Sequence, residues 1–356
     1  MNILVLYKDN GKGGLTTNTK VLVEGLRKRQ INTVVAGSDG LGTRTILSDL
    51  NVNIINFSSK NPIKVYMQIK KLVNDNKIDL IHAQNRIPSL YASVICMFNK
   101  KVKYVWANHQ VPIPYDFFHR ITTKYGERAI TGSIDGYKLL TEKLRIPKEK
   151  VSIVNLGVDT SKFVPVSINE QNALKQKYQI KDNEKVILLY GRLTEHKGHF
   201  FLLESLAKLN SIENIKLILP GEGNEEYKNS IIEYAKKIGF EDKIIFPGFV
   251  NGREILSIAD LMVLPSKQEG FPISCIEAYC MGIPVIRTKS GGYEDTKEFC
   301  TGVEYENTDE LSTELQLFIE GDNKFALKVK KALDCKERFS TSRMIDQYIS
   351  IYNDIL

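Results

Sequence analysis

Two glutamates eight positions apart carry the clearest chemical signal in this chain of 356 residues. Glu269 and Glu277 flank a short Gly-Phe-Pro-Ile loop that follows an apolar, strand-like stretch, and Glu277 opens a helical run over residues 278–281. Backbone N–H groups at a helix N-terminus bind phosphate oxygens and sugar hydroxyls. The segment therefore predicts a ligand that is anionic at one end and rich in hydroxyl groups at the other.

Two cations stand directly after the first strand of the second half. The segment Gly191-Arg-Leu-Thr-Glu-His-Lys-Gly198 places Arg192 and Lys197 between the end of a strand and the start of a helix. A guanidinium and an ammonium in that position can hold a diphosphate from two sides. The alternative is a pair of solvated surface cations, and the strand-end position beside glycine favours the diphosphate.

Further glycine-containing loops follow other predicted strands. Gly13 and Gly14 stand between the first strand and the first helix, where free backbone N–H groups can approach a phosphate, although the segment is neither a Gly-x-Gly-x-x-Gly nor a P-loop sequence. Gly248, Phe249 and Val250 lie in a loop that could hold a nucleotide base through its backbone. A simple turn is an equal alternative for that loop.

His109 follows the strand-like stretch 103–107 in the first half. A lone histidine is more often structural, and His82, which ends its predicted strand, fits that role. His109 is the better candidate for a ligand contact, because it would look across the gap between the two halves toward Glu269.

Short apolar runs alternate with helical patterns along the whole chain. Such alternation is typical of parallel sheets covered by helices on both faces. In the first half, strands are expected at 3–7, 33–36, 53–55, 79–82, 103–107 and 151–154, and helices at 16–29, 62–74 and 87–98. In the second half, strands are expected at 185–190, 215–219, 243–246, 261–264 and 284–287, followed by a helical pattern from 309 that is broken near 340–342.

The length exceeds what one hydrophobic core usually serves, so two domains are expected. The polar stretch 159–183 is the predicted connection, which gives a first domain at 1–160 and a second at 161–340. Two similar α/β halves imply a cleft between them at the carboxyl ends of both sheets, because ligands of open α/β sheets bind at that edge.

Bulk composition points to a soluble globular protein, with 42% hydrophobic and 26% charged residues. The apolar start of the chain lacks the pattern of a signal peptide, and no run approaches the roughly 18 apolar residues that cross a bilayer. The five cysteines are odd in number and lack metal-ligand spacing. A cytoplasmic location, or a peripheral one on the inner face of the plasma membrane, is therefore expected.

Positive charge is concentrated in the first half. Residues 1–160 contain 24 Lys and Arg against 12 Asp and Glu, whereas residues 161–356 contain 25 against 30. This asymmetry suggests an anionic partner for the first domain, either a membrane leaflet or a phosphorylated acceptor. On charge alone, an ordinary lysine-rich surface is an equal alternative. Nucleic acid is not expected as a partner, since the aromatic platform that stacks bases is not evident.

Aromatic and basic residues interleave at 115–120, as they do in membrane-interface segments. Together with Lys124 and the lysines of the 62–74 helix (Lys64, Lys70 and Lys71), this stretch suggests peripheral attachment to an anionic membrane. Core packing is the slightly favoured alternative for Phe117 and Phe118.

Taken together, these segments resemble the retaining nucleotide-sugar glycosyltransferases of family 4. The resemblance extends over nearly the whole chain, and its most specific parts are the Glu-x7-Glu segment, the Gly-Arg-Leu…Lys-Gly block and the Gly-x-Pro-Val of 282–285. It implies the GT-B fold, in which two Rossmann-like domains with parallel sheets face each other. It also implies that a C-terminal helix, here 341–356, crosses back to the first domain.

The family's site residues transfer onto matching positions of this sequence. The resemblance implies that Arg192 and Lys197 bind the donor diphosphate, Glu277 accepts hydrogen bonds from ribose hydroxyls, and Glu269 holds the donor sugar. His109 would bind a sugar hydroxyl and shield the reacting carbon. The residues that it implies for contacts to the nucleotide, phosphate or sugar, mostly through backbone atoms, are Gly13, Gly14, Gly191, Gly248, Phe249, Val250, Phe271, Pro272 and Ile273.

The implied activity is transfer of a hexosyl or N-acetylhexosaminyl group, with retention, from a nucleotide-diphosphate sugar to a glycan or lipid-linked acceptor in cell-surface polysaccharide synthesis. No metal and no cofactor besides the nucleotide-sugar co-substrate is expected, because no Asp-x-Asp motif appears and cations stand in for a divalent ion. The alternatives are a sugar-nucleotide epimerase of the same fold and a non-catalytic glycan-binding protein.

Overall fold

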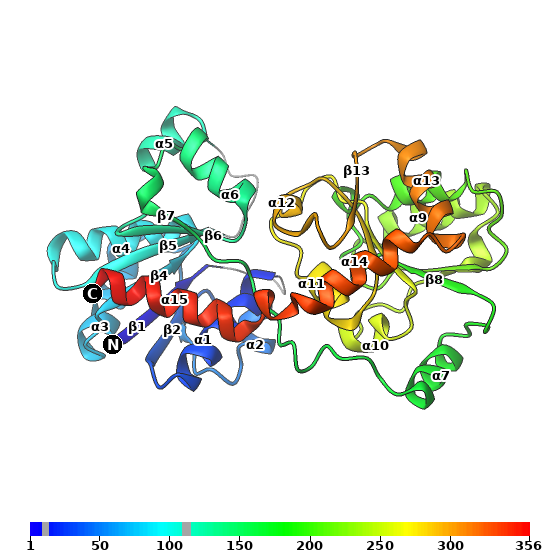
Figure 1. The fold of residues 1–356 in the computed structure, drawn as a ribbon. Helices are drawn as coiled ribbons and strands as arrows, with labels where there is room; N and C mark the ends of the chain where they lie inside the picture. Colours follow the sequence, from blue (N-terminus) through cyan, green and yellow to red (C-terminus); the bar gives the residue numbers. More distant parts are fainter. Residues whose placement is uncertain (9–13, 109–114) are drawn as a thin grey trace. The chain divides into compact units, whose positions relative to one another are not determined.

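The computed structural model describes residues 1–8, 14–108 and 115–356, and it divides into two compact units (Figure 1). Unit 1 consists of Met1–Gly157 together with Thr341–Leu356, and unit 2 consists of Val158–Ser340. Each unit is built around one parallel sheet, as the alternating pattern predicted. The α/β fold class is thereby confirmed.

In the described part of unit 1 the sheet has seven strands in the order β3-β2-β1-β4-β5-β6-β7. Because the order reverses between β1 and β4, the loops that follow these two strands diverge to opposite faces and leave a crevice at the carboxyl edge. The strands are β1 (Asn2–Tyr7), β2 (Asn32–Gly37), β3 (Asn53–Ile54), β4 (Leu80–Gln84), β5 (Lys103–Asn108), β6 (Arg128–Thr131) and β7 (Val151–Ile153).

Helices lie on both sides of this sheet (Figure 1). They are α1 (Gly14–Lys28), α2 (Leu41–Thr45), α3 (Pro62–Asp75), α4 (Arg86–Phe98), α5 (Phe117–Thr122), α6 (Ile134–Lys138) with its π-helical continuation η1 (Leu139–Lys143), the 3₁₀ turn η2 (Lys148–Lys150) and α15 (Thr341–Ile355).

The sheet of unit 2 repeats the same plan with six strands in the order β10-β9-β8-β11-β12-β13. Its reversal lies between β8 and β11, so the loops after these strands occupy the ligand-binding position of an open α/β sheet. The strands are β8 (Lys185–Leu188), β9 (Ile215–Ile218), β10 (Ile244–Ile245), β11 (Leu261–Leu264), β12 (Val285–Thr288) and β13 (Thr301–Val303).

The central strands of both sheets are buried on both faces, which explains their continuous apolar runs. The unit 2 core joins these strands to the apolar faces of the surrounding helices. These helices are α7 (Ile168–Lys177), α8 (His199–Leu206), α9 (Glu225–Lys237), α10 (Gly252–Leu256), α11 (Ile273–Met281), α12 (Tyr293–Thr296), α13 (Thr308–Ile319) and α14 (Asn323–Asp334), with 3₁₀ turns η3 (Glu195–Lys197), η4 (Glu241–Lys243) and η5 (Lys336–Phe339).

The C-terminal helix α15 packs inside unit 1, next to α1. Tyr352 is fully buried, and its hydroxyl lies 2.8 Å from Nδ1 of His82 in the middle of β4. Gly25 of α1 faces Ile345 so closely that a Cβ there would overlap the isoleucine side chain. His82 thus has a structural contact inside the core, although it lies within its strand and not at the strand end.

Several boundaries differ from the sequence-based expectations. Strands β6 and β13 were not predicted, and the polar connection 159–183 contains helix α7. The helical pattern between 309 and the predicted break near 340–342 is two helices, because Gly321 adopts a left-handed φ of 83° between α13 and α14. The final helix α15 begins at the predicted break, after a 3₁₀ turn. Helix α11 begins at Ile273, so Glu277 stands in its second turn and does not open it.

Candidate functional site

Three loops of unit 2 are hydrogen-bonded to one another at the carboxyl edge of its sheet. The backbone N–H of Gly191 donates to the carbonyl of Pro220 over 3.3 Å, and that of Gly221 donates to the carbonyl of Gly248 over 2.8 Å. The loops after β8, β9 and β10 therefore form one continuous rim. Gly191 and Gly248 were predicted to contact the ligand, with a simple turn as the alternative for Gly248, and here both take part in the hydrogen bonds that hold neighbouring loops together.

Gly221 shows why this rim requires glycine. Its φ is 138°, and a Cβ there would overlap the carbonyl oxygen of Gly191. A left-handed φ is strained for residues with a side chain, and a close backbone approach leaves no room for one. Any other residue at this position would push the Gly191–Arg192 loop away from the rim.

Lys197 and Glu269 form an ion pair at the centre of this edge. The Lys197 Nζ atom lies 2.6 Å from Oε1 of Glu269, and the two side chains are only 16% and 11% exposed. The lysine stem passes over Gly191, where a Cβ would lie 3.4 Å from its Cε atom. The structure therefore brings together two predicted site residues, 72 positions apart in the chain.

The turn that carries Lys197 is held in place by the loop that follows β11. Gly198 has a φ of 77°, and a Cβ there would overlap the carbonyl oxygen of Pro265, at the end of β11. The backbone N–H of Lys267 also donates to the carbonyl of His196 over 2.8 Å. The lysine and the glutamate thus stand on two loops that are locked to each other.

Arg192 has an exposed side chain, and none of the described residues forms an ion pair with it. A free guanidinium at the rim is available to an anionic ligand. Its assignment to the diphosphate remains a prediction.

The loop before α11 packs against the loop after β12. A Cβ at Gly291 would overlap the carbonyl of Glu269, and Gly292, with a φ of 76°, lies against Pro272. Phe271 is buried, and its ring lies 5.9 Å from that of Phe339. Ile273 is the first residue of α11. The sugar and phosphate contacts at these positions stay predictions.

Arg287 holds this loop pair in place, and the sequence did not single it out. Its side chain is fully buried, and its Nη2 atom donates to the carbonyls of Ser290 and Gly291 over 3.2 and 2.7 Å. Its Nη1 atom donates to the Thr296 hydroxyl over 3.3 Å. The arginine stabilises the loop that supports Glu269, so we assign it a positioning role.

Glu277 lies in a second cluster, with Tyr190 and Gly252. A Cβ at Gly252 would lie 2.9 Å from the Tyr190 hydroxyl and 3.3 Å from Oε2 of Glu277. Burial raises the pKa of the Glu277 carboxyl from 4.5 to about 8. Burial and the charge of Glu277 also raise the pKa of Tyr190. A buried carboxyl that can hydrogen-bond to hydroxyl groups fits the predicted ribose contact.

The loop after β10 presents an open surface. Gly248 has a φ of 74°, a Cβ added there would have no neighbouring atom within 4 Å, and Phe249 is 78% exposed. The side chain of Val250 is half-buried. Space above a glycine backbone suits a flat ligand, and the binding of a base there remains a prediction.

Two predicted site residues, His109 and Gly13, lie outside the described residues. Gly14 is described, and it is the exposed first residue of α1. Within the described ranges, no group of three or more His, Cys, Asp or Glu side chains could hold a metal ion. In the same ranges, no helix is long and apolar enough to cross a membrane.

Asn85 is a residue of unit 1 that the sequence did not indicate. It joins β4 to α4 with φ 68° and ψ 175°, a conformation that is normally restricted to glycine. Its Nδ2 atom donates to the carbonyl of Lys8 over 2.7 Å, and its backbone N–H donates to Ala107 over 3.1 Å. Asn85 therefore ties the end of β1 to the end of β5.

We expect Asn85→Ala to lower the free energy of unfolding by about 1 kcal/mol, because it loses a hydrogen bond while the backbone strain of the wild type is unchanged. Asn85→Gly loses the same bond but relieves the strain, so its stability should stay near that of the wild type. Urea unfolding of both variants measures the difference. Equal losses in the two variants would mean that the backbone is not strained.

The sequence matches two family models. The model for glycosyl transferases group 1 covers residues 170–337, and the model for glycosyltransferase family 4 covers residues 12–162. The chain belongs to glycosyltransferase family 4. The resemblance drawn from the Glu-x7-Glu and Gly-Arg-Leu…Lys-Gly segments is confirmed.

Relatives of this family-4 chain match it in part. An uncharacterised glycosyltransferase of Methanocaldococcus jannaschii is 32% identical over 150 residues, which are 41% of this chain and 38% of that relative. A UDP-Gal:alpha-D-GlcNAc-diphosphoundecaprenol alpha-1,3-galactosyltransferase of Escherichia coli is 25% identical over 252 residues, which are 67% of this chain and 64% of that enzyme. The chain thus spans less than two thirds of the length of either protein.

Among solved structures, that of Anabaena HepE in complex with UDP resembles this family-4 chain with a TM-score of 0.89 at 18% identity. The similarity covers 99% of this chain and all of the other. At this identity the similarity shows the fold alone, and that fold is the predicted GT-B type.

Proposed function

We propose that the protein transfers a hexosyl or N-acetylhexosaminyl group, with retention and without a metal ion, from a nucleotide-diphosphate sugar to a glycan or lipid-linked acceptor. The observation that carries this proposal is the Lys197–Glu269 ion pair at the carboxyl edge of the unit 2 sheet. The UDP in HepE and the UDP-sugar named for the Escherichia coli relative support a uridine nucleotide as the donor's carrier.

The ion pair can exchange its partner when a donor arrives. A diphosphate would attract the Lys197 ammonium, and the freed Glu269 carboxylate would accept hydrogen bonds from sugar hydroxyls. Arg192, exposed at the same rim, would contact the diphosphate from its other side. A pair that is formed before the donor binds keeps both charges oriented, which lowers the cost of rearrangement during the reaction.

In the transfer step, the bond between the sugar C1 and the diphosphate oxygen breaks while the acceptor oxygen bonds to C1 on the same face. The diphosphate takes the bonding electron pair, and its oxygen accepts the proton of the acceptor hydroxyl. Lys197 and Arg192 stabilise the negative charge that develops on this leaving group. In this proposal Glu269, once it is freed from Lys197, accepts hydrogen bonds from sugar hydroxyls, and no protein side chain attacks C1.

The acceptor would bind to unit 1. The Escherichia coli relative's name states a diphosphoundecaprenol-linked acceptor, which supports a lipid-linked acceptor here and synthesis of a cell-surface polysaccharide. A lipid-linked acceptor would bring the protein to the inner face of the membrane, and the excess of positive charge in residues 1–160 supports that location.

A thermal-shift panel of UDP-, GDP-, ADP- and CDP-sugars tests the donor assignment. We expect a UDP-sugar at about 100 times its Kd to raise the melting temperature by about 5 °C or more, because binding at that excess stabilises by about 2.7 kcal/mol. UMP and inorganic phosphate serve as controls and should give smaller shifts. A panel in which no nucleotide sugar raises the melting temperature would contradict the proposal.

A nucleotide-release assay with the best binder then tests the reaction. Release that depends on an added acceptor, survives EDTA and yields a product with the anomeric configuration of the donor supports retaining, metal-independent transfer. Conversion of the donor sugar into its epimer without an acceptor would favour the epimerase instead. Binding without turnover on an array of glycan and prenyl-diphosphate acceptors would favour a non-catalytic protein.

A further inference from the structure

The outward face of α4 in unit 1 is entirely apolar. The exposed residues of this helix are Ile87, Leu90, Val94, Met97 and Phe98. Their spacing of three or four positions places them on one side of the helix. No charged residue occurs from Ile87 to Asn99, whereas a surface helix normally has a charged outer face.

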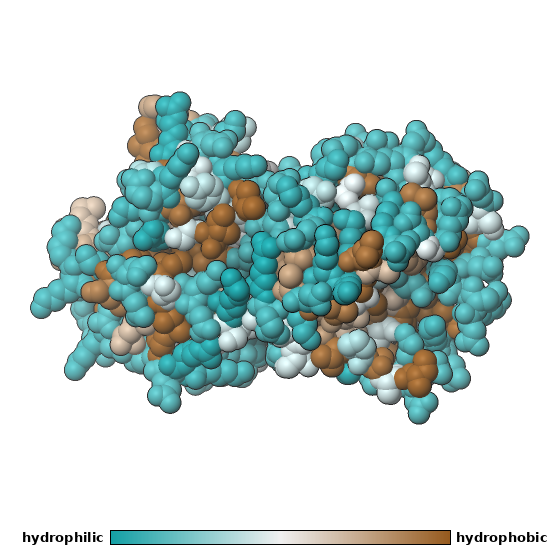
Figure 2. All heavy atoms as spheres, viewed as in Figure 1, coloured by the Kyte–Doolittle hydropathy of each residue, from teal (hydrophilic) through white to brown (hydrophobic). Residues whose placement is uncertain are grey.

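The short helix α5 extends this surface. Phe117, Phe118 and Ile121 are 75%, 68% and 59% exposed, so the core-packing alternative for the two phenylalanines is wrong. The two helices are joined, since the Nη2 atom of Arg86 donates to the Thr122 hydroxyl over 2.9 Å. Figure 2 shows hydrophobic residues at the tip of unit 1 where α5 lies. We call these eight residues of α4 and α5 the apolar face.

Cations stand at both ends of the apolar face. Arg120 and Lys124 accompany α5, and the exposed Lys100 and Lys101 follow the end of α4. Of the two nearby acids, Asp116 contacts His119, and Glu127 forms an ion pair with Lys103 at 3.6 Å. The four cations outnumber Asp116, so the net charge beside the apolar face is positive and complementary to anionic lipid headgroups.

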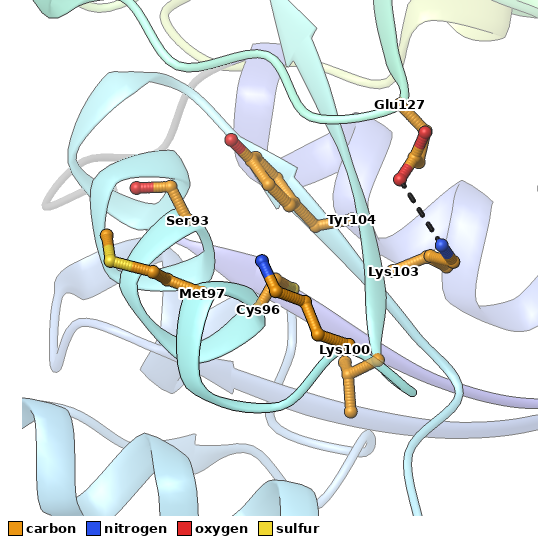
Figure 3. Close-up of a pocket in the computed structure, with 8 residues that line it drawn as sticks. Ser93, Cys96, Met97, Lys100, Lys103, Tyr104 and Glu127 are labelled. Atoms are coloured by element: carbon orange, nitrogen blue, oxygen red, sulfur yellow. Dashed lines mark ion pairs between the residues drawn. The ribbon is translucent and has the colours of Figure 1, made fainter.

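A pocket of about 280 Å³ opens where α4 ends (Figure 3). Met97 and Cys96 line it from α4, Tyr104 lines it from β5, and the Lys100 ammonium points into the space between Met97 and Tyr104. An ammonium beside exposed apolar side chains can meet a phosphate at the depth where those side chains meet acyl chains.

We propose that the apolar face, flanked by these cations, docks unit 1 on an anionic lipid bilayer. Large aromatic and aliphatic side chains enter the interface between headgroups and acyl chains, and the cations contact the phosphates. This docking specifies which surface of unit 1 would meet the membrane, and it rests on the proposed function only for its biological purpose. Vesicle binding without donor or acceptor keeps failure of docking separate from failure of transfer.

The test is flotation of the full chain with vesicles of phosphatidylcholine alone and with about one third phosphatidylglycerol, a fraction that gives a surface potential attractive to lysine and arginine. We expect binding to the anionic vesicles alone, weakened by salt. Two double variants should each reduce binding to the anionic vesicles about tenfold or more: Met97→Ser with Phe98→Ser, and Phe117→Ser with Phe118→Ser. Each removes a large apolar area that would become buried on docking. Lys100→Glu with Lys101→Glu should reduce binding similarly.

Matched controls lie on unit 2. Ile168→Ser removes a side chain that is 65% exposed, and Lys236→Glu with Lys237→Glu reverses two exposed lysines of α9. These controls should float like the wild type. Equal binding to both vesicle types, no binding, or loss in the controls alone would overturn the proposal. A protein that does not bind vesicles but forms a dimer, and loses that dimer in the Met97→Ser/Phe98→Ser variant, would also overturn the proposal. The apolar face would then be an interface between two copies of the chain.

Discussion

Replacing Lys197 with alanine should abolish measurable transfer, with a fall in kcat/KM of about 100-fold or more and weaker binding of the donor. Its ammonium is the cation closest to Glu269, and the charge on a departing diphosphate has to be neutralised in the transition state. A charge that is held in place in a mostly buried site contributes more than a solvated one. Steady-state kinetics with the nucleotide sugar that gives the largest thermal shift measures the effect.

The matched control is Lys267→Ala, which removes an exposed lysine from the loop that hydrogen-bonds to the Lys197 turn. Its rate should remain within about threefold of the wild type, because a surface cation stabilises little. Near-normal turnover in the Lys197 variant would remove this residue from the mechanism.

Lys197→Ala also leaves Glu269 without its cation in a site where it is only 11% exposed. An unpaired, mostly buried carboxylate is costly, so the single variant should melt at a lower temperature than the wild type. Adding Glu269→Gln removes that charge and should restore part of the melting temperature without restoring turnover. If both the melting temperature and turnover recovered, the low activity of the single variant would have come from impaired folding.

The parallel sheets could be predicted because their central strands are buried on both faces. Leu4 and Val105 belong to continuous apolar runs of β1 and β5 and lie fully inside, and Ile81 is equally buried in β4 beside His82. Strands β6 and β13 escaped detection because each is short and carries few large apolar residues: β13 is Thr-Gly-Val. Register with a neighbouring strand, which makes these residues part of the sheet, is not visible in the local sequence.

The site could be predicted where residues carry chemistry in a recognisable spacing, as Lys197 and Glu269 do. Their direct pairing could not be predicted, because it depends on how two loops 72 positions apart meet. Arg287 and Asn85 were missed for a related reason. Both act on backbone carbonyls through burial and strained geometry, and neither property leaves a motif in the sequence.

Glu277 should make the stability of the protein depend on pH. The folded carboxyl keeps its proton up to a pKa of about 8, whereas the unfolded chain loses it above 4.5. Between these values the unfolded state binds fewer protons, so the free energy of unfolding falls as pH rises, by up to about 1.4 kcal/mol per pH unit. Glu277→Gln stays neutral, so its advantage over the wild type should grow from pH 5 to pH 8 and then level. A constant difference would show that the carboxyl titrates normally.

Binding of the donor should reverse the protonation of Glu277. Ribose hydroxyls donate hydrogen bonds more strongly to a carboxylate than to a neutral carboxyl, so binding favours the ionised form. At pH 7, below the pKa of about 8, the wild type should therefore release close to one proton when UDP-glucose binds. The diphosphate of a nucleotide sugar has no ionisation near neutrality, so the released proton comes from the protein.

Calorimetry in buffers of different ionisation enthalpy counts these protons. The wild type should show release at pH 7 and little above pH 9, with an affinity that rises with pH up to about 8. Glu277→Gln should release none and bind the donor with a higher Kd, while Glu233→Gln, at an exposed position of α9, should behave like the wild type. Identical release from the Glu277 and Glu233 variants would place the ribose elsewhere. Release that disappears only in the Glu277 variant would identify this carboxyl as the group that binds the nucleotide's hydroxyls.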